Sequence, residues 1–399
     1  MSPAQIDAPP VPPQGAGVNG YFDCNATTPL HPAARAAWLE AADRYWQNPS
    51  SLYREAGAAR QQLENCREQV ADWLGCEATE IVFLSGATEA NNAVIALAAA
   101  SGLAGMALSA VEHPCVREPA LHHFPDRCHE IPVTGEGVTN LTALEEILTT
   151  HQPGLVAVMA ANNESGVLQP WREALALCRK HGALFHCDAA QWIGKKPAAG
   201  LGACDFVNGS AHKFGGPKGI GFLKVPATGR PFRSLRGGPQ ESRRRAGTEN
   251  LPAIAAMVAA WEAQETSLAS READWLKARQ GFEEKILTLL PGVEIIARHA
   301  PRLWNTVLLT VPAPGNVKWL TRLSALGFSV STGSACSRGA GASDVLRAMG
   351  LPESSQGQVL RISAGWDSTT DDWLALADAL ATVSATLGER PTGPAPAFR

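Results

Sequence analysis

The sequence of 399 residues lacks the features that mark membrane-spanning and nucleic-acid-binding proteins. It holds no run of eighteen uncharged apolar residues, since the alanine-rich stretch 93–110 is interrupted by glycine. The net charge is -4, and the longest basic cluster, Arg243 to Arg245, is too short to form a patch. We therefore expect no contact with a membrane and no direct contact with nucleic acid.

Cysteine pairs are also missing. The chain has nine cysteines, an odd number, and none of them form a CxxC pair, so we expect neither a disulfide framework nor a metal site. Reduced thiols fit a reducing compartment. The first 19 residues are rich in proline and lack the basic and apolar regions of a signal peptide, so we expect a disordered tail and a cytoplasmic protein.

Short apolar runs alternate with helix-like stretches between residues 79 and 225. Such alternation predicts an α/β fold with βαβ units, a mainly parallel seven-stranded sheet flanked by helices, and ligands at the carboxyl ends of the strands. The predicted strands are 80–84, 105–110, 128–133, 154–160, 182–188, 204–210 and 219–225, and the helix-like segments include 89–100, 141–150 and 171–180.

The alternation ends near residue 230, which predicts a second, smaller α+β domain. Its expected elements are long helical stretches over 251–290, strands over 292–297, 304–311 and 358–363, and helices over 316–326 and 371–387. The predicted organisation is a tail (1–19), an N-terminal segment packing with the small domain (20–35), a large domain (36–265), a small domain (266–389) and a second tail (390–399).

Two motifs place polar groups where predicted strands end. In FLSGATEANN a predicted strand runs into Ser85-Gly86-Ala87-Thr88, where a helix begins. Such a helix start forms an anion site suited to phosphate. The same residues would also fit an ordinary helix N-cap. In HCDAAQ another predicted strand ends and presents Asp188 and Gln191 at the carboxyl edge of the sheet; Asp188 could cap a helix or hold a heteroaromatic nitrogen protonated.

The third motif, GSAHKFGGPKGIGF, puts Lys213 at the end of another predicted strand. Burial lowers the pKa of an amine toward the neutral nucleophile, whereas a single lysine in a turn is more often a surface residue. The order of the three motifs, a phosphate cradle, an aspartate and then Ser-x-His-Lys, favours a catalytic lysine.

This order resembles that of the fold type I enzymes that use pyridoxal 5'-phosphate (PLP). The residues of these motifs are similar to those of the cysteine desulfurases of the class V aminotransferase-like group, and the resemblance extends over residues 20 to 387. The further matching stretches are YFDCNATTPLHP, QNPSSLYREAG, VEHPCV, ANNESGVLQP, RRAGTENLP, STGSACS and VLRISAG.

The resemblance implies a role for each matching residue. Lys213 would bind PLP covalently and move the α-proton of the substrate, L-cysteine, and His113 would stack on the PLP ring and exchange protons. The remaining cofactor ligands would be Ala87, Thr88, Asn163, Asp188, Gln191, Ser210, His212 and Thr248, and Asn163 and Arg361 would bind the substrate. Thr248 would reach the site from a second subunit, which implies a homodimer.

The resemblance also assigns Cys336, in the stretch STGSACSRGAGASDVL, as the nucleophile that takes the sulfur as a persulfide. This long form of the cysteine loop implies delivery to an acceptor protein, such as an iron-sulfur scaffold or a thiolation carrier. Two alternatives stay open: a selenocysteine lyase or other PLP-dependent C–S lyase, and a non-catalytic interaction protein on the same fold.

Overall fold

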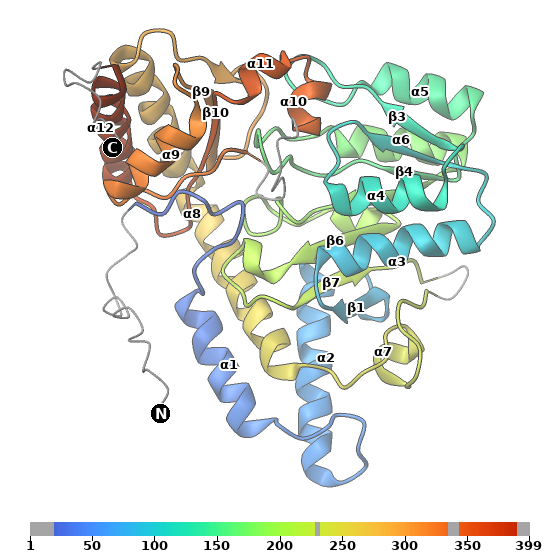
Figure 1. Ribbon diagram of the computed structural model, residues 1–399. Coiled ribbons are helices and arrows are strands. Elements are labelled where there is room, and N and C mark those ends of the chain that lie inside the picture. Colours follow the sequence, from blue (N-terminus) through green and yellow to red (C-terminus); the bar gives the residue numbers. More distant parts are fainter. Residues whose placement is uncertain (1–19, 228–231, 334–342, 389–399) are drawn as a thin grey trace, which may run out of the picture.

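The computed structural model describes residues 20–227, 232–333 and 343–388, and Figure 1 shows two sheets, each packed against helices. Within these ranges the α-helices are α1 (Pro32–Arg44), α2 (Arg54–Leu74), α3 (Ala87–Ala100), α4 (Pro114–His123), α5 (Leu141–Thr150), α6 (Trp171–His181), α7 (Gln240–Arg243), α8 (Leu251–Leu289), α9 (Asn316–Ala325), α10 (Asp344–Ala348), α11 (Glu353–Gln356) and α12 (Thr370–Gly388). Three short 3-10 helices are η1 (Ala78–Glu80), η2 (Leu201–Ala203) and η3 (Ala211–Lys213).

The larger sheet has seven strands in the order β1-β7-β6-β5-β4-β2-β3. β7 alone runs in the opposite direction to the other six strands, so the prediction of a mainly parallel seven-stranded sheet is confirmed. The strands are β1 (Ile81–Leu84), β2 (Met106–Ser109), β3 (Cys128–Ile131), β4 (Leu155–Ala157), β5 (Leu184–Asp188), β6 (Phe206–Ser210) and β7 (Gly221–Lys224), one for each predicted run.

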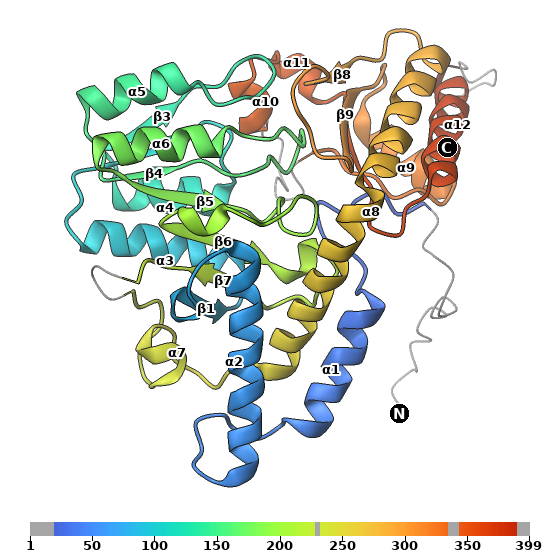
Figure 2. The same cartoon turned by 180° about the vertical axis from the view of Figure 1, so that it is seen from behind.

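Both faces of this sheet are covered, because alternate residues of a strand point to opposite sides. Ile81 and Phe83 of β1 belong to a core shared with α1, α2, α5, α6 and α8. Val82 and Leu84 belong to a second core shared with α3 and α4. Figures 1 and 2 show the sheet from these two sides, with α3 and α4 in front in the first view and α2, α5 and α6 in front in the second.

The smaller sheet is antiparallel, in the order β10-β9-β8, with β8 (Ile295–Ile296), β9 (Thr306–Thr310) and β10 (Val359–Ser363). The helix α8 joins the two sheets, since Leu251 to Trp261 pack in the first core while Leu268 to Ile286 pack with β9, β10 and α12. Phe22 packs in this core of the smaller sheet. We propose that the two domains meet within α8, near the expected boundary at residues 265 and 266.

The structure adds helices for which the sequence analysis had no prediction. The largest is α2, whose sequence is mostly polar but whose buried residues Ala59, Leu63, Cys66 and Val70 recur every three or four positions. Conversely, the strand expected over residues 292–297 is reduced to Ile295–Ile296. Within the described ranges, none of the helices combines the length and the hydropathy that a membrane span requires.

Candidate active site

The carboxyl ends of the parallel strands surround a cavity of about 760 Å³. Parallel strands end at the same edge of a sheet, so residues distant in the sequence meet there. Ten of the predicted site residues line the cavity: Ala87, Thr88, His113, Asn163, Asp188, Gln191, Ser210, His212, Lys213 and Arg361. Thr248 is exposed and lies outside this lining. Cys336 lies outside the described residues.

At one end of the cavity, α3 begins with backbone N–H groups that no side chain caps. Its first residues are Ala87 and Thr88, and the preceding Gly86 has a φ of +144°, a conformation that favours glycine. A Cβ at Gly86 would lie 2.9 Å from the Ser210 Oγ, so glycine keeps open the space between the helix and this hydroxyl. The arrangement forms a cradle for an anion such as a phosphate.

Asp188 is buried and held by two donors. Its Oδ1 accepts from the Ala190 N–H at 2.9 Å, and its Oδ2 accepts from the Asn91 Nδ2 at 2.8 Å. The Asn91 Oδ1 accepts in turn from the Asn208 Nδ2 and from the His186 Nε2, both at 2.6 Å. Complete burial lowers the pKa of His186 to about 4, so the imidazole is neutral and carries its hydrogen on Nε2. This chain of amides orients the carboxylate toward the cavity.

Lys213 lies in η3, directly after β6. Its Nζ donates to the carbonyl oxygen of Asn25 at 2.6 Å and to that of Ala26 at 3.0 Å. Both acceptors belong to the N-terminal segment, which also bonds the same turn through Thr28, whose N–H donates to the His212 carbonyl at 2.8 Å. The amine is therefore placed in the cavity wall by contacts with two residues that stand 188 and 187 positions earlier in the sequence.

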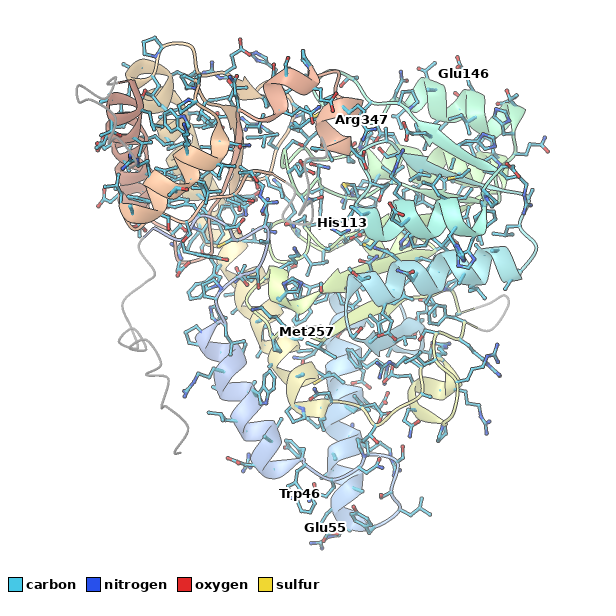
Figure 3. The ribbon with its side chains drawn as sticks, viewed as in Figure 1. Trp46, Glu55, His113, Glu146, Met257 and Arg347 are labelled. Atoms are coloured by element: carbon cyan, nitrogen blue, oxygen red, sulfur yellow. The ribbon has the colours of Figure 1, made fainter. Side chains whose placement is uncertain are left out.

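His113 caps the beginning of α4, and Figure 3 labels it near the middle of the molecule. Its Nδ1 accepts from the Cys115 N–H at 3.1 Å, and the Cys115 Sγ lies 3.0 Å away. Burial lowers the pKa of His113, and the nearby Asp188 opposes this effect. A neutral ring that accepts at Nδ1 carries its hydrogen on Nε2. His113 can therefore donate from Nε2 to a ligand in the cavity.

Arg361 comes from β10 of the smaller sheet and is almost completely buried. Its NH1 donates to the Asn163 carbonyl at 3.1 Å and its NH2 pairs with the Asp23 Oδ1 at 2.6 Å, whereas its Nε has no partner in the described structure. Glu164 lies beside it, and burial raises the pKa of that carboxyl. The guanidinium, which lines the cavity, retains a donor for an acidic ligand.

Several cavity residues were not assigned by the sequence analysis. Asn25 and Glu164 line the cavity, and Asn91 lies behind it with its amide bonded to Asp188. All three lie inside motifs that the sequence analysis quoted, yet spacing alone could not show where their side chains point. Glu112 also lines the cavity, and burial and the charge of Asp188 raise the pKa of its carboxyl well above the usual range. Within the described residues, no cluster of His, Cys, Asp and Glu side chains is arranged to hold a metal ion.

Comparison with known proteins assigns the family. A model described as aminotransferase class-V matches residues 20–376. The chain belongs to the aminotransferase class-V family. Within this PLP-dependent family it lies in the cysteine desulfurase group: it is 38% identical over 354 residues to the cysteine desulfurase of Enterobacter agglomerans, covering 86% of this chain and 87% of that protein.

Solved structures agree with this assignment to the aminotransferase class-V family. A NifS-like protein superposes with a TM-score of 0.85 at 29% sequence identity, covering 92% of this chain and 100% of that one. The structure described as SspA in complex with cysteine has a TM-score of 0.74 at 28% identity, covering 86% of this chain and 98% of the other. The expected fold type I architecture is thereby confirmed.

The cavity residues also fit the cofactor of the family. PLP carries a phosphate, a pyridine nitrogen, a phenolic oxygen and an aldehyde. The cavity presents an open anion cradle at Gly86, a buried carboxylate at Asp188, a side-chain amide at Gln191 and an amine at Lys213, all in one lining. Each group of the cofactor therefore has a residue of complementary chemistry.

Proposed function

We propose that this chain is a cysteine desulfurase that converts L-cysteine to L-alanine and transfers the sulfur to Cys336. The observation that carries the proposal is the single cavity in which Lys213, Asp188 and Arg361 converge from the two sheets. The cysteine named in the description of the similar SspA structure supports the choice of substrate.

PLP would be held at every polar end by residues of the cavity. The start of α3 at Ala87 and Thr88, together with Ser210 and His212, would bind the phosphate. Asp188 would pair with the pyridine nitrogen, Gln191 would donate to the phenolic oxygen, and Lys213 would bind the aldehyde carbon. When bound, PLP withdraws electrons from the α-carbon of an amino acid.

The residues of the chain would then bind the substrate and move its protons. Arg361 and Asn163 would bind the carboxylate of cysteine, and the unpartnered Arg361 Nε supports this role. The Lys213 amine, displaced by the substrate, would take the α-proton. His113 would exchange a proton at Nε2 with the sulfur or with the leaving carbon skeleton.

Sulfur transfer balances without an added oxidant. The Cys336 thiolate would attack the substrate sulfur, forming an S–S bond while the Cβ–S bond breaks. The electron pair of the broken bond stays on Cβ, which takes up a proton, so alanine leaves and Cys336 becomes a persulfide. We propose that the persulfide passes to an acceptor protein in the cytoplasm, such as an iron-sulfur scaffold or a thiolation carrier.

We propose further that a second copy of the chain completes the site. Thr248 is exposed and lies outside the cavity of its own subunit. The neighbouring Arg245 pairs with Glu89 at 3.1 Å, and Glu89 does line the cavity, so this segment begins at the cavity rim. Light scattering of the purified protein should give the mass of a homodimer, and the mass of a monomer would contradict this part of the proposal.

The central test is the variant Cys336→Ser. We expect the variant to keep bound PLP and its visible absorbance, and to lose formation of alanine from cysteine. Cys128→Ser, which changes a half-buried thiol in β3, is the control and should stay active. If Cys336→Ser still forms alanine at the wild-type rate, the protein is another C–S or C–Se lyase. Borohydride labelling should attach PLP to Lys213 and should fail in Lys213→Ala.

A further inference from the structure

A buried lysine that the proposed function does not use lies directly behind Gln191. Lys195 is 4% exposed, and its Nζ donates to the Gln191 Oε1 at 2.5 Å. The two residues stand four positions apart in the turns that follow β5, and Gln191 lines the cavity while Lys195 does not. Lys195 therefore contacts the active site through one side chain.

The surroundings of Lys195 differ from those of two other lysines of the large domain. Lys196 pairs with Glu272 at 2.6 Å and the buried Lys224 pairs with Glu80 at 3.1 Å. In the described ranges, no carboxylate lies within ion-pair distance of Lys195, and its pKa is lowered to about 7 by burial first and by the charge of Lys213 second. A buried amine without a counter-ion lowers stability, so its presence beside an active site favours a functional role.

The contacts of Gln191 admit only one orientation of its amide. The Oε1 accepts from Lys195, and the Nε2 donates to the Asn25 carbonyl at 2.9 Å. The reversed amide would set its oxygen against the Asn25 carbonyl oxygen, which has no donor, whatever the charge of Lys195, and its NH₂ against an amine whose charged form has no acceptor. One N–H of Nε2 is used by Asn25, which leaves the other for a ligand in the cavity.

We propose that Lys195 is a positioning residue that holds the Gln191 amide with its N–H toward the cavity. This inference rests on the proposed function, in which Gln191 donates to the phenolic oxygen of PLP. If the amide turned, its carbonyl oxygen would face that oxygen, and the two acceptors would repel each other. Lys195 thereby favours binding of a cofactor that has a hydrogen-bond acceptor facing the Gln191 N–H.

Three variants test the inference: Lys195→Met, Gln191→Leu and, as a matched control, Lys196→Met. Lys195→Met should weaken PLP binding by about tenfold, the worth of one hydrogen bond to a charged oxygen. It should also shift the visible absorbance of bound PLP in the same direction as Gln191→Leu. Lys196→Met should change neither property. The apoprotein of Lys195→Met should unfold at a temperature no lower than the wild type, because a buried charge is removed.

Combining the variants shows whether Lys195 acts through Gln191. In the double variant, Lys195→Met should add little to the effects of Gln191→Leu on affinity and absorbance, whereas full additivity would overturn the inference. Wild-type affinity and absorbance in Lys195→Met would overturn it too. If Lys195→Met does not fold, Lys195→Gln replaces it in the test. This variant keeps an N–H donor and should retain the wild-type absorbance of bound PLP. An absorbance shift as large as that of Gln191→Leu would refute the positioning role of Lys195. A wild-type protein that binds no PLP would refute the proposed function itself.

Discussion

Replacement of Asn91 by alanine should destabilise the protein far more than replacement of its neighbour Asn92. Asn91 is completely buried on α3, where its amide connects Asp188 with two side chains from β5 and β6. Asn92 points outward, and its Nδ2 makes one exposed bond, to the Thr88 carbonyl at 2.9 Å. The two positions thus differ in burial and connectivity but not in residue type.

The magnitude follows from the groups that Asn91→Ala leaves without partners. The His186 Nε2 and the Asn208 Nδ2 would lose their acceptor, and the Asp188 Oδ2 would lose a donor. The His186 Nδ1 and the Asn208 Oδ1 already have no partner in the described structure, so no other bond of these side chains compensates. At about 1 to 3 kcal/mol for each buried unsatisfied group, reduced by relaxation, we expect a loss of about 3 to 5 kcal/mol.

Urea unfolding of the apoprotein measures the difference. Asn92→Ala should change the free energy of unfolding by no more than about 0.5 kcal/mol, as is usual for an exposed substitution. Asn91→Ala should also bind PLP more weakly, because the Asp188 carboxylate is no longer oriented. A loss below about 1 kcal/mol for Asn91→Ala, or one equal to that of Asn92→Ala, would refute the view that Asn91 holds this network together.

Two further predictions concern a buried ion pair and a half-buried histidine. In urea unfolding, Glu241→Ala should lower the free energy of unfolding by about 3 to 5 kcal/mol, because it leaves Arg67 buried without its bidentate partner at 2.7 and 2.9 Å. The control Glu40→Ala, which removes an exposed ion pair with Arg44, should lower it by less than about 0.5 kcal/mol. Equal losses in the two variants would contradict the prediction. The pKa of His212 is lowered to about 4, by burial first and by the charge of Lys213 second. Between about pH 4 and 6.5 the unfolded state therefore binds more protons than the folded state. The free energy of unfolding consequently falls as the pH is lowered through this window. His212→Asn should fall less steeply there, and an unchanged slope in pH-dependent unfolding would show that His212 does not contribute.

The strands of the larger sheet were predictable because each is a short apolar run bounded by turns. Asp188 and Ser210 are the last residues of two of these runs, and the structure places both at one edge of the sheet, since parallel strands end on the same side. The helices α1 and α2 were missed because their polar surface obscures the buried stripe. That stripe forms only when Ala59, Leu63 and Val70 pack against the first core.

The site shows the same division between local pattern and tertiary contact. By itself, the sequence determined the family, the α/β fold and ten of the cavity residues, because motif order and strand ends are local properties of the chain. Only the tertiary structure decided that Asn91 supports Asp188, that Asn25 meets Lys213, and that Lys195 orients Gln191. These contacts join residues whose side-chain directions depend on how α3, the N-terminal segment and the turns after β5 pack together, and no spacing in the sequence encodes those directions.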